Sequence, residues 1–461
     1  MKTRRFISLV ILCFCWFAGA AIFTSAAQAP GTQNPAVVAR ETARSDRTLA
    51  AGLDRTYDFS PKASTPAPKG YEPVFVEHYG RHGSRYAYTA KAYTVPMNLL
   101  RRALDEDNIT GRGAKLLADL ERFWEQGQYK VGDLTPLGWQ QHERIAREMV
   151  QAYRPAFGKG ARVDACSSAS TRAIVSMASF CASVAREVPG TDVYAHQSVM
   201  DIQATRPNMG KNPFRYTGPE IVFPFAESPR EFLQRRMPGY GEALSRLFRD
   251  PARAMRDTDV FDFFFNYYML VAGMDSIPEE ERIDMRGLLT DEEFATLWEI
   301  DNYERFREYL PYKLPCASIV DDIVAKADAR LGLAAPAGDS AASAGITRGA
   351  DLRFGHDHVV MSLLMDMDIN GFGVIPSEPD DLAGSFQTWH SPMAANIQIV
   401  FFVPKKAAKK GPVAASDVLV KVLLNGSEAR FGELSPASGP YYRWSELKDY
   451  LARRTAMVVT R

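Results

Sequence analysis

Short apolar runs that end near a glycine or a serine alternate with longer stretches of helical periodicity along the chain. Residues 73–79 are mostly apolar and stop at Gly80, as is typical of a buried strand. Residues 162–165 and 351–354 begin two further predicted strand-to-helix units: apolar residues at helical spacing follow the first, and the run 359–365 follows the second. Strands that alternate with helices in this way predict an α/β fold, with a mostly parallel sheet flanked by helices.

Two other patterns add elements to this fold. Thr135 precedes Pro136 at the start of a helical pattern, so Thr135 is expected to cap that helix. Near the C-terminus, residues 397–403 and 418–424 are predicted strands joined by the polar loop 405–411. These two strands are expected to form a hairpin at or near the sheet edge.

Changes in composition and in apolar periodicity also divide the chain into segments. Residues 30–68 are rich in Ala, Thr, Pro and Ser, and are expected to form an extended N-terminal arm. Between 190 and 345 the apolar period becomes helical, which predicts an inserted helical cap domain that ends in a mobile linker at 333–345. Residues 69–189 and 346–461 remain for the α/β core.

The first residues have a pattern of their own. Three basic residues within the first five positions precede an apolar run over 6–23, and small residues follow. This pattern predicts a secretory signal peptide at 1–29, cleaved near Ala27 or Ala29, and therefore an exported protein, periplasmic or secreted. After removal of the signal no stable membrane insertion is expected, although the apolar run is long enough for an uncleaved anchor.

The composition excludes several classes of protein. The 461 residues are 46% hydrophobic and 24% charged, unlike a collagen, a coiled coil or a disordered tail. The 55 basic and 55 acidic side chains give a formal net charge of zero, and no basic block stands out, so no nucleic-acid partner is expected. Any anionic ligand must therefore be met by a local cluster of cations.

Cysteine usage narrows the chemistry further. Only Cys166, Cys181 and Cys316 lie beyond the predicted signal, which is too few for a disulfide framework. No CxxC motif occurs, which excludes a zinc ribbon and a thioredoxin-type redox site.

The segment Arg81-His82-Gly83-Ser84-Arg85 directly follows the first predicted strand. Open α/β sheets bind ligands at loops of this kind, at the carboxyl ends of their strands. Each arginine presents a planar fork of donors that fits phosphate oxygens, and Gly83 lets the backbone turn and approach closely. The segment therefore predicts a phosphate site, the alternative being a surface loop with a solvated histidine.

Two later junctions carry matching chemistry. Arg172 lies in the first turn of the helix expected after 162–165, where free N–H groups favour an anion. His356 and Asp357 follow 351–354, where an acid could protonate a leaving oxygen, although Asp357 alone is equally well explained as a helix cap. Parallel strands bring these junctions to one edge of the sheet. The six side chains expected to line one crevice there are Arg81, His82, Arg85, Arg172, His356 and Asp357.

These six side chains suit phosphomonoester hydrolysis through a phosphohistidine. His82 would attack phosphorus, while the arginines and His356 stabilise the phosphate oxygens. Asp357 would protonate the leaving alkoxide and then help water to release phosphate. The guanidinium groups supply the positive charge, so no metal and no other cofactor is expected, and the partner is a small phosphate ester.

Two other functions fit part of the same residues. A metal-dependent hydrolase would use His78, His82, His356 and His358 as ligands, although the glycines at 80 and 83 oppose the helix that would place the first two together. A non-catalytic phosphoester-binding protein would keep the arginines without turnover, although the nucleophile and acid candidates weigh against it.

The RHGxR loop and the distal His-Asp pair resemble the histidine acid phosphatase clan, branch 2 of the histidine phosphatase superfamily. Within the clan the resemblance is nearest to the multiple inositol-polyphosphate phosphatases and the histidine-type phytases. It extends over roughly residues 50–450. The other matching segments, in the same order along the chain, are 134–138 with Gln141 and His142, 167–172, 393–396 and 420–425.

The resemblance implies roles for the predicted residues. It makes His82 the nucleophile and Asp357 the proton donor. The side chains that it implies bind phosphate are Arg81, Arg85, Arg172 and His356. It further implies phosphate esters as substrates, inositol polyphosphates such as phytate in particular.

The resemblance also covers the helical insertion, which corresponds to a domain that lies over the substrate. Arg206, Lys211 and Arg215 are expected near its entrance, where they could contact further phosphates, although solvated surface charge is the commoner role of such residues. The sequence departs from the family in two places. Tyr86 follows the loop where a proline is common, and His358 stands where many inositol-polyphosphate enzymes have a glutamate.

Overall fold

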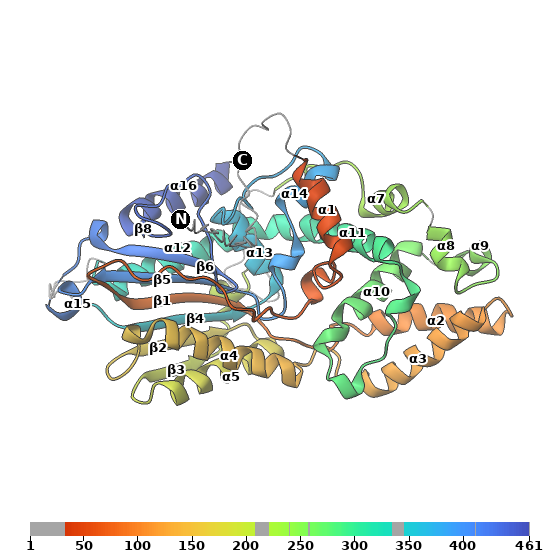
Figure 1. Ribbon diagram of the computed structural model, residues 1–461, viewed down its shortest axis with the longest axis horizontal. Helices are drawn as coiled ribbons and strands as arrows, with labels where there is room; N and C mark the ends of the chain where they lie inside the picture. Colours follow the sequence, from red (N-terminus) through yellow and green to blue (C-terminus); the bar gives the residue numbers. More distant parts are fainter. Residues whose placement is uncertain are drawn as a thin grey trace, which may run out of the picture.

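The computed structural model describes residues 33–207, 221–238, 240–256, 259–333, 345–410 and 412–460. Within these ranges, eight strands form one sheet, and a further group of helices lies beyond one end of it (Figure 1). The strands are β1 (Tyr71–Arg81), β2 (Arg162–Ser167), β3 (Asp192–His196), β4 (Gly349–Gly355), β5 (Asn396–Pro404), β6 (Leu419–Leu424), β7 (Ser427–Glu428) and β8 (Tyr442–Arg443). The helices are α1 (Pro35–Ser45), α2 (Lys91–Asp105), α3 (Gly111–Gly127), α4 (Pro136–Ala152), α5 (Thr171–Glu187), α6 (Ile202–Thr205), α7 (Pro229–Arg236), α8 (Tyr240–Ser245), α9 (Pro251–Ala254), α10 (Val260–Ala272), α11 (Asp291–Tyr309), α12 (Lys313–Arg330), α13 (Asp357–Asp366), α14 (Leu382–Ser385), α15 (Ala407–Lys410) and α16 (Trp444–Thr460).

The sheet is mixed, in the order β3-β2-β4-β1-β5-β6-β7, with β8 also paired to β6. The first four strands in this order run parallel, whereas β5, β6, β7 and β8 join by antiparallel pairing. The predicted α/β fold with a largely parallel central sheet is confirmed. The predicted C-terminal pair is also antiparallel, but β5 lies inside the sheet, between β1 and β6, so only β6 is near the edge.

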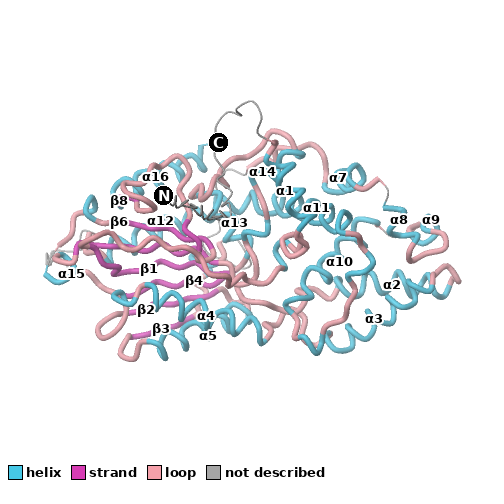
Figure 2. Tube along the Cα trace, viewed as in Figure 1, coloured by secondary structure: helices cyan, strands magenta, loops and turns pink. Residues whose placement is uncertain are grey.

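Each face of the sheet is covered by its own helices (Figure 2). α4 and α5 pack on each other over one face, and α12, α13 and α16 cover the other. The alternation of side chains along β1 supplies both cores: Val76 belongs to the cluster under α4 and α5, and Phe75 and Tyr79 belong to the cluster on the opposite face. A strand that is buried on both faces explains the continuous apolar run in its sequence.

The start of α4 follows its sequence signals. The hydroxyl of Thr135 accepts the N–H of Gly138 at 3.3 Å, and the helix begins at Pro136. The fixed φ of proline suits the first helical position, where its missing N–H costs no hydrogen bond. The predicted cap is therefore confirmed, and it places the first turn of α4 against the loop that follows β1.

The group of helices beyond the sheet is built from four parts of the chain. α2 and α3 pack on each other, α10 packs on α2, and α1 packs on α11 and α14. Of the predicted cap range, 190–345, β3 pairs with β2 in the sheet and α12 packs on β1, whereas α1, α2 and α3 lie outside this range. Helical periodicity indicates that a face is buried but not which partner buries it, so the sequence pattern could not assign these segments.

The predicted N-terminal arm also differs from expectation. It contains α1 instead of being extended throughout, because Asn34 caps the helix and Ala36, Ala39 and Ala43 form a small buried stripe. The predicted signal at 1–29 and most of the predicted linker at 333–345 lie outside the described residues. None of the helices that the structure describes is both long and apolar enough to cross a membrane.

Candidate active site

The carboxyl ends of β1, β4 and β2 lie side by side, as parallel pairing requires. Arg81, the last residue of β1, pairs with Gly355, the last residue of β4, and Ser167 of β2 pairs with Phe354. The backbone N–H of His82 donates to the carbonyl of Gly355 at 3.0 Å. The three junctions singled out in the sequence therefore share one edge of the sheet.

Four of the six predicted side chains lie close to one another at this edge. The rings of His82 and His356 meet edge to face, with centroids 5.5 Å apart. The guanidinium of Arg81 lies 3.0 Å from the carboxylate of Asp357. Nε2 of His356 lies 2.9 Å from the hydroxyl of Ser168, in the turn before α5. Residues far apart in the chain thus form one cluster.

Arg81 is held rigidly in this cluster. It is fully buried, and its Nη1 donates to the backbone carbonyls of Leu53 and Ser391 at 2.5 and 2.6 Å. Its Nη2 faces Asp357. Two fixed contacts on one nitrogen leave the guanidinium a single orientation, which favours precise positioning of an anion.

Arg85 is held by a partner that the sequence analysis missed. Its Nη2 lies 3.1 Å from the carboxylate of Asp54, and its Nη1 donates to the carbonyl of Tyr86 at 3.1 Å. The guanidinium also lies over the ring of Tyr88, 5.1 Å from its centroid. Asp54 comes from the predicted arm, where a single acidic residue forms no recognisable pattern.

Arg172 brings positive charge into the site from the first turn of α5. Its buried Nε makes no hydrogen bond to any residue that the structure describes. Burial, followed by the charge of Arg85, lowers its pKa to about 10. Arg206 and Arg81 add to this effect, and Asp357 opposes it. Like charges gathered in this way favour the binding of an anion between them.

Arg206 is the one predicted substrate contact that the structure describes. It follows α6, and its buried Nε makes no hydrogen bond within the described ranges. Burial, then the charges of His358 and Arg206, lower the pKa of His356 well below its usual range. Arg206 thus faces the predicted site, whereas Lys211 and Arg215 lie outside the described residues.

The imidazole of His82 is neutral and has a defined tautomer. Nδ1 lies 3.0 Å from the carbonyl oxygen of Gly83, and because a carbonyl only accepts, Nδ1 carries the proton. Nε2 therefore keeps its lone pair. Burial, then the charges of Arg81 and Arg172, lower the pKa of His82 well below its usual range. The ring remains an uncharged nucleophile even in acid.

Asp357 is ionised in the empty site. Burial alone would raise its pKa, but the charge of Arg81, followed by contact with His358, holds the pKa well below the usual range. Its side chain keeps 19% of its surface exposed. The carboxyl group is therefore reachable by a ligand, and its protonation depends on the charges around it.

The loop after β1 is supported from behind by α4 and α5. The N–H of Gly83 donates to the hydroxyl of Ser176 at 3.1 Å. The N–H of Ser84 donates to the side-chain oxygen of Gln141 at 2.8 Å, and the amide of Gln141 donates back to the hydroxyl of Ser84 at 2.9 Å. These bonds fix the backbone that carries His82.

A methyl group at position 83 would disturb this support. A Cβ there would lie 2.4 Å from the carbonyl oxygen of Gly138 and 2.6 Å from its Cα, so backbone would have to move. We expect Gly83→Ala to lower the free energy of unfolding by about 1–3 kcal/mol and to reduce activity. Denaturant unfolding measures the first effect and phosphate release the second.

Gly111→Ala is the matched control for this prediction. Gly111 begins α3, and a Cβ there would meet no atom within 4 Å. Its replacement should leave stability unchanged or slightly increased. Equal stability of both variants and the wild type would show that the contact between Gly83 and Gly138 is not tight.

The histidine at position 78 does not belong to this cluster. His78 and His142 are buried beside Phe180 and Phe354, and burial lowers the pKa of both histidines to about 3. Within the described residues, no group of three or more His, Cys, Asp or Glu side chains is arranged to hold a metal ion. The metal-dependent alternative is therefore not favoured.

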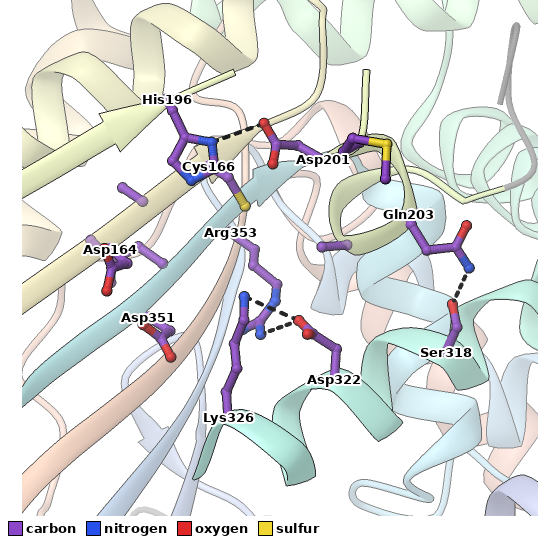
Figure 3. Close-up of a pocket in the computed structure, with 14 residues that line it drawn as sticks. Asp164, Cys166, His196, Asp201, Gln203, Ser318, Asp322, Lys326, Asp351 and Arg353 are labelled. Atoms are coloured by element: carbon purple, nitrogen blue, oxygen red, sulfur yellow. Dashed lines mark hydrogen bonds and ion pairs between the residues drawn. The ribbon is translucent and has the colours of Figure 1, made fainter. Parts of the chain in front are cut away.

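A separate cavity of about 260 Å³ lies between β2, β4, α6 and α12 (Figure 3). Polar groups at its wall pair with one another: Arg353 lies 2.6 Å from Asp322, and His196 lies 3.1 Å from Asp201. None of the six predicted side chains is among the described residues that line it. The cavity and the cluster at the sheet edge are thus distinct.

Comparison with solved structures identifies the fold. The multiple inositol polyphosphate phosphatase of Bifidobacterium longum, in complex with phosphate, superposes with a TM-score of 0.71 at 18% identity, over 88% of this chain and 98% of the other. Its complex with inositol hexasulfate gives 0.69 at 17% identity, with the same coverage. The phytase from D. castellii gives 0.61 at 16% identity, over 89% of this chain and 85% of the other.

The chain has the fold of these phosphatases. The fold that the resemblance to the histidine acid phosphatases implies is therefore confirmed. No protein-family model matches the sequence, and no curated protein sequence does. At such low identity the likeness establishes the architecture, so the chemistry has to be argued from the side chains themselves.

Proposed function

We propose that this protein is an exported phosphomonoesterase that hydrolyses phosphate esters through a covalent phosphohistidine on His82. The observation that carries the proposal is a neutral imidazole with an available lone pair, surrounded by the guanidinium groups of Arg81, Arg85 and Arg172. A carboxyl group, Asp357, completes the cluster. Phosphatases of the same fold support this reaction class.

In the first step, Nε2 of His82 attacks phosphorus in line with the leaving oxygen. The P–N bond forms as the P–O bond breaks, and the leaving oxygen takes a proton from Asp357. The three arginines and His356 donate hydrogen bonds to the remaining phosphate oxygens, where charge develops. The alcohol then leaves.

In the second step, water attacks the phosphohistidine. Asp357, now a carboxylate, accepts a proton from this water as the P–N bond breaks, and inorganic phosphate forms. His82 and the protonated carboxyl group are thereby regenerated. The cycle needs one water molecule and no external acid.

The charges of the site predict activity at acid pH. Because its pKa is lowered, His82 stays neutral as the pH falls, whereas Asp357 donates only when protonated. A bound phosphate ester shares the charge of Arg81 and places negative charge beside the carboxylate, which raises its pKa in the complex. We therefore expect kcat to fall as the pH rises from acidic to neutral, and pH profiles of kcat measure this. In Asp357→Asn the fall should disappear, and a wild-type kcat that rises toward neutral pH would contradict the assignment.

We propose inositol polyphosphates as the preferred substrates. Arg206 supplies charge beyond the arginines around His82, and Lys211 and Arg215 are proposed to contact further phosphates. A phosphatase of this fold has been solved with inositol hexasulfate, which carries many anionic groups. We expect metal-free phosphate release from inositol hexakisphosphate to exceed release from glucose phosphate by about tenfold in kcat/KM, as one added charged contact provides. Equal rates would oppose this preference, and inactivation by chelators would favour the metal-dependent alternative.

Export is proposed from the N-terminal pattern of the sequence. Expression of the full chain with sequencing of the N-terminus of the exported protein should find cleavage near Ala27 or Ala29. An intact N-terminus in the membrane fraction would instead indicate a retained anchor.

A further inference from the structure

His358 lies beside Asp357, the proposed proton donor, and only one of its two ring nitrogens has a polar neighbour among the described residues. Nδ1 lies 3.6 Å from Oδ1 of Asp357, and the ring lies parallel to that of His356, with centroids 5.5 Å apart and an angle of 9°. The ring of Tyr312 also lies close to it, at 4.8 Å between centroids. Nε2 is buried and makes no hydrogen bond to any described residue.

The unsatisfied Nε2 is informative because a buried polar atom without a partner costs free energy. His358 is only 7% exposed and lies among aromatic rings, where a phenyl ring would fill the same space without that cost. A phenyl ring would lack both ring nitrogens. Of the two, Nδ1 is the one that has a polar neighbour among the described residues. Its neighbour is the carboxylate of Asp357.

The two oxygens of the Asp357 carboxylate are therefore held differently. Oδ1 accepts the backbone N–H of His358 at 2.9 Å and also faces the ring Nδ1. Oδ2 faces Arg81 at 3.0 Å, on the side where the phosphate would bind. An oxygen that accepts hydrogen bonds is a poor place for a proton. When a bound phosphate ester takes over the charge of Arg81, Oδ2 loses its ion pair while Oδ1 keeps the N–H of His358, so the proton of the acid form is directed to Oδ2.

We propose that His358 is a positioning residue for the proton donor: its Nδ1–H, 3.6 Å from Oδ1, adds positive potential to the oxygen that already accepts the backbone N–H, so that the transferable proton is carried by Oδ2 and faces the leaving oxygen. This inference rests on the proposed function, since it requires Asp357 to be the acid. As the P–O bond breaks, the proton passes from Oδ2 to the leaving oxygen. The ring of His358 exchanges no proton in this step.

Other groups around the pair bear on its charge and must be kept constant in a test. From β1 and its loop, Arg81 and His82 face Asp357, and Arg172 of α5 and Tyr309 of α11 also interact with it. Tyr312 and His356 contact the ring of His358. Substitution of His358 leaves all of these groups in place.

The test compares substrates that differ in their need for an acid. Glycerol phosphate has a poor leaving group that must be protonated, whereas dinitrophenyl phosphate releases a stable phenolate without a proton. We expect His358→Phe to lower kcat for glycerol phosphate about tenfold and to leave kcat for dinitrophenyl phosphate within about twofold, since only the acid-catalysed part of the rate is affected. Its Tm should not fall, because the substitution removes an unsatisfied buried nitrogen.

A second variant tests the role of Nδ1. The amide N–H of asparagine can take the place of Nδ1–H, so His358→Asn should recover most of the rate for glycerol phosphate. Loss of both rates by the same factor in His358→Phe, or no loss at all, would overturn the inference. So would an equal loss in the Asn and Phe variants.

Asp357→Asn separates this inference from the proposed function. We expect it to lower the rate of phosphohistidine formation from glycerol phosphate about 100-fold and to change formation from dinitrophenyl phosphate little, measured in a single turnover, because only this first step depends on the leaving group. If Asp357→Asn shows no dependence on the leaving group, the proposed acid is wrong. If it does show this dependence and His358→Phe does not, only the role of His358 is wrong.

Discussion

Replacement of His82 by alanine is expected to lower kcat by at least about 10⁴-fold while the protein still binds phosphate, since the nucleophile is lost and the arginines remain. Arg81 is held by backbone carbonyls and Asp357, and Arg85 by Asp54, so neither depends on His82 for its position. Hydrolysis of inositol hexakisphosphate measures the first effect, and calorimetric titration with inorganic phosphate measures the second.

The matched control is His196→Ala. His196 is a half-exposed histidine that pairs with Asp201 in the separate cavity and touches none of the predicted side chains. It should keep wild-type turnover. Unchanged hydrolysis in His82→Ala would refute the phosphohistidine mechanism, and phosphate binding without turnover in the wild type would favour the non-catalytic alternative.

Substitution of Arg172 by glutamine is expected to lower kcat/KM about 100-fold, which is typical for loss of one donor to a developing negative charge. The same variant should have a Tm that is no lower than that of the wild type. The pKa of Arg172 is below its ordinary value, so its charged form is less favourable in the folded protein than in the unfolded chain at every pH below about 10. Removal of that charge relieves repulsion from Arg85 and Arg206.

Thermal unfolding with and without phosphate tests the predicted effect on stability. Phosphate should raise the Tm of the wild type more than that of Arg172→Gln, because the ligand neutralises the repulsion only where all the charges are present. Arg186, on the exposed part of the same helix and paired with Glu143, offers a control that should change neither activity nor the response to phosphate. A large loss of stability in Arg172→Gln would contradict this electrostatic account.

Much of the site could be predicted because its parts are local in sequence. A strand that ends in a glycine-containing loop and a helix that begins with a cap are patterns of a few residues, and parallel strands bring their carboxyl ends together without further information. Arg81, His82, His356 and Asp357 meet for this reason.

The supports of the site could not be predicted in the same way. Arg85 is held by Asp54 and Arg81 by the carbonyl of Leu53, contacts that depend on how a distant segment folds back over the loop. Every residue has a backbone carbonyl, so the sequence does not indicate which one will accept a hydrogen bond from Arg81. The packing partners of α2 and α3 could not be predicted for a related reason, because these helices have the same amphipathic pattern whichever partner they pack against.

The pairing of β1 with β4 also determines when the protein can become active during synthesis. His82 follows β1 and Asp357 follows β4, and almost all of the outlying helices are encoded between them. A nascent chain that stops before residue 349 holds the proposed nucleophile but has neither its acid nor the strand that orients it. A polypeptide delivered unfolded across a membrane would thus leave the phosphate esters of its own cell untouched until it had folded on the far side.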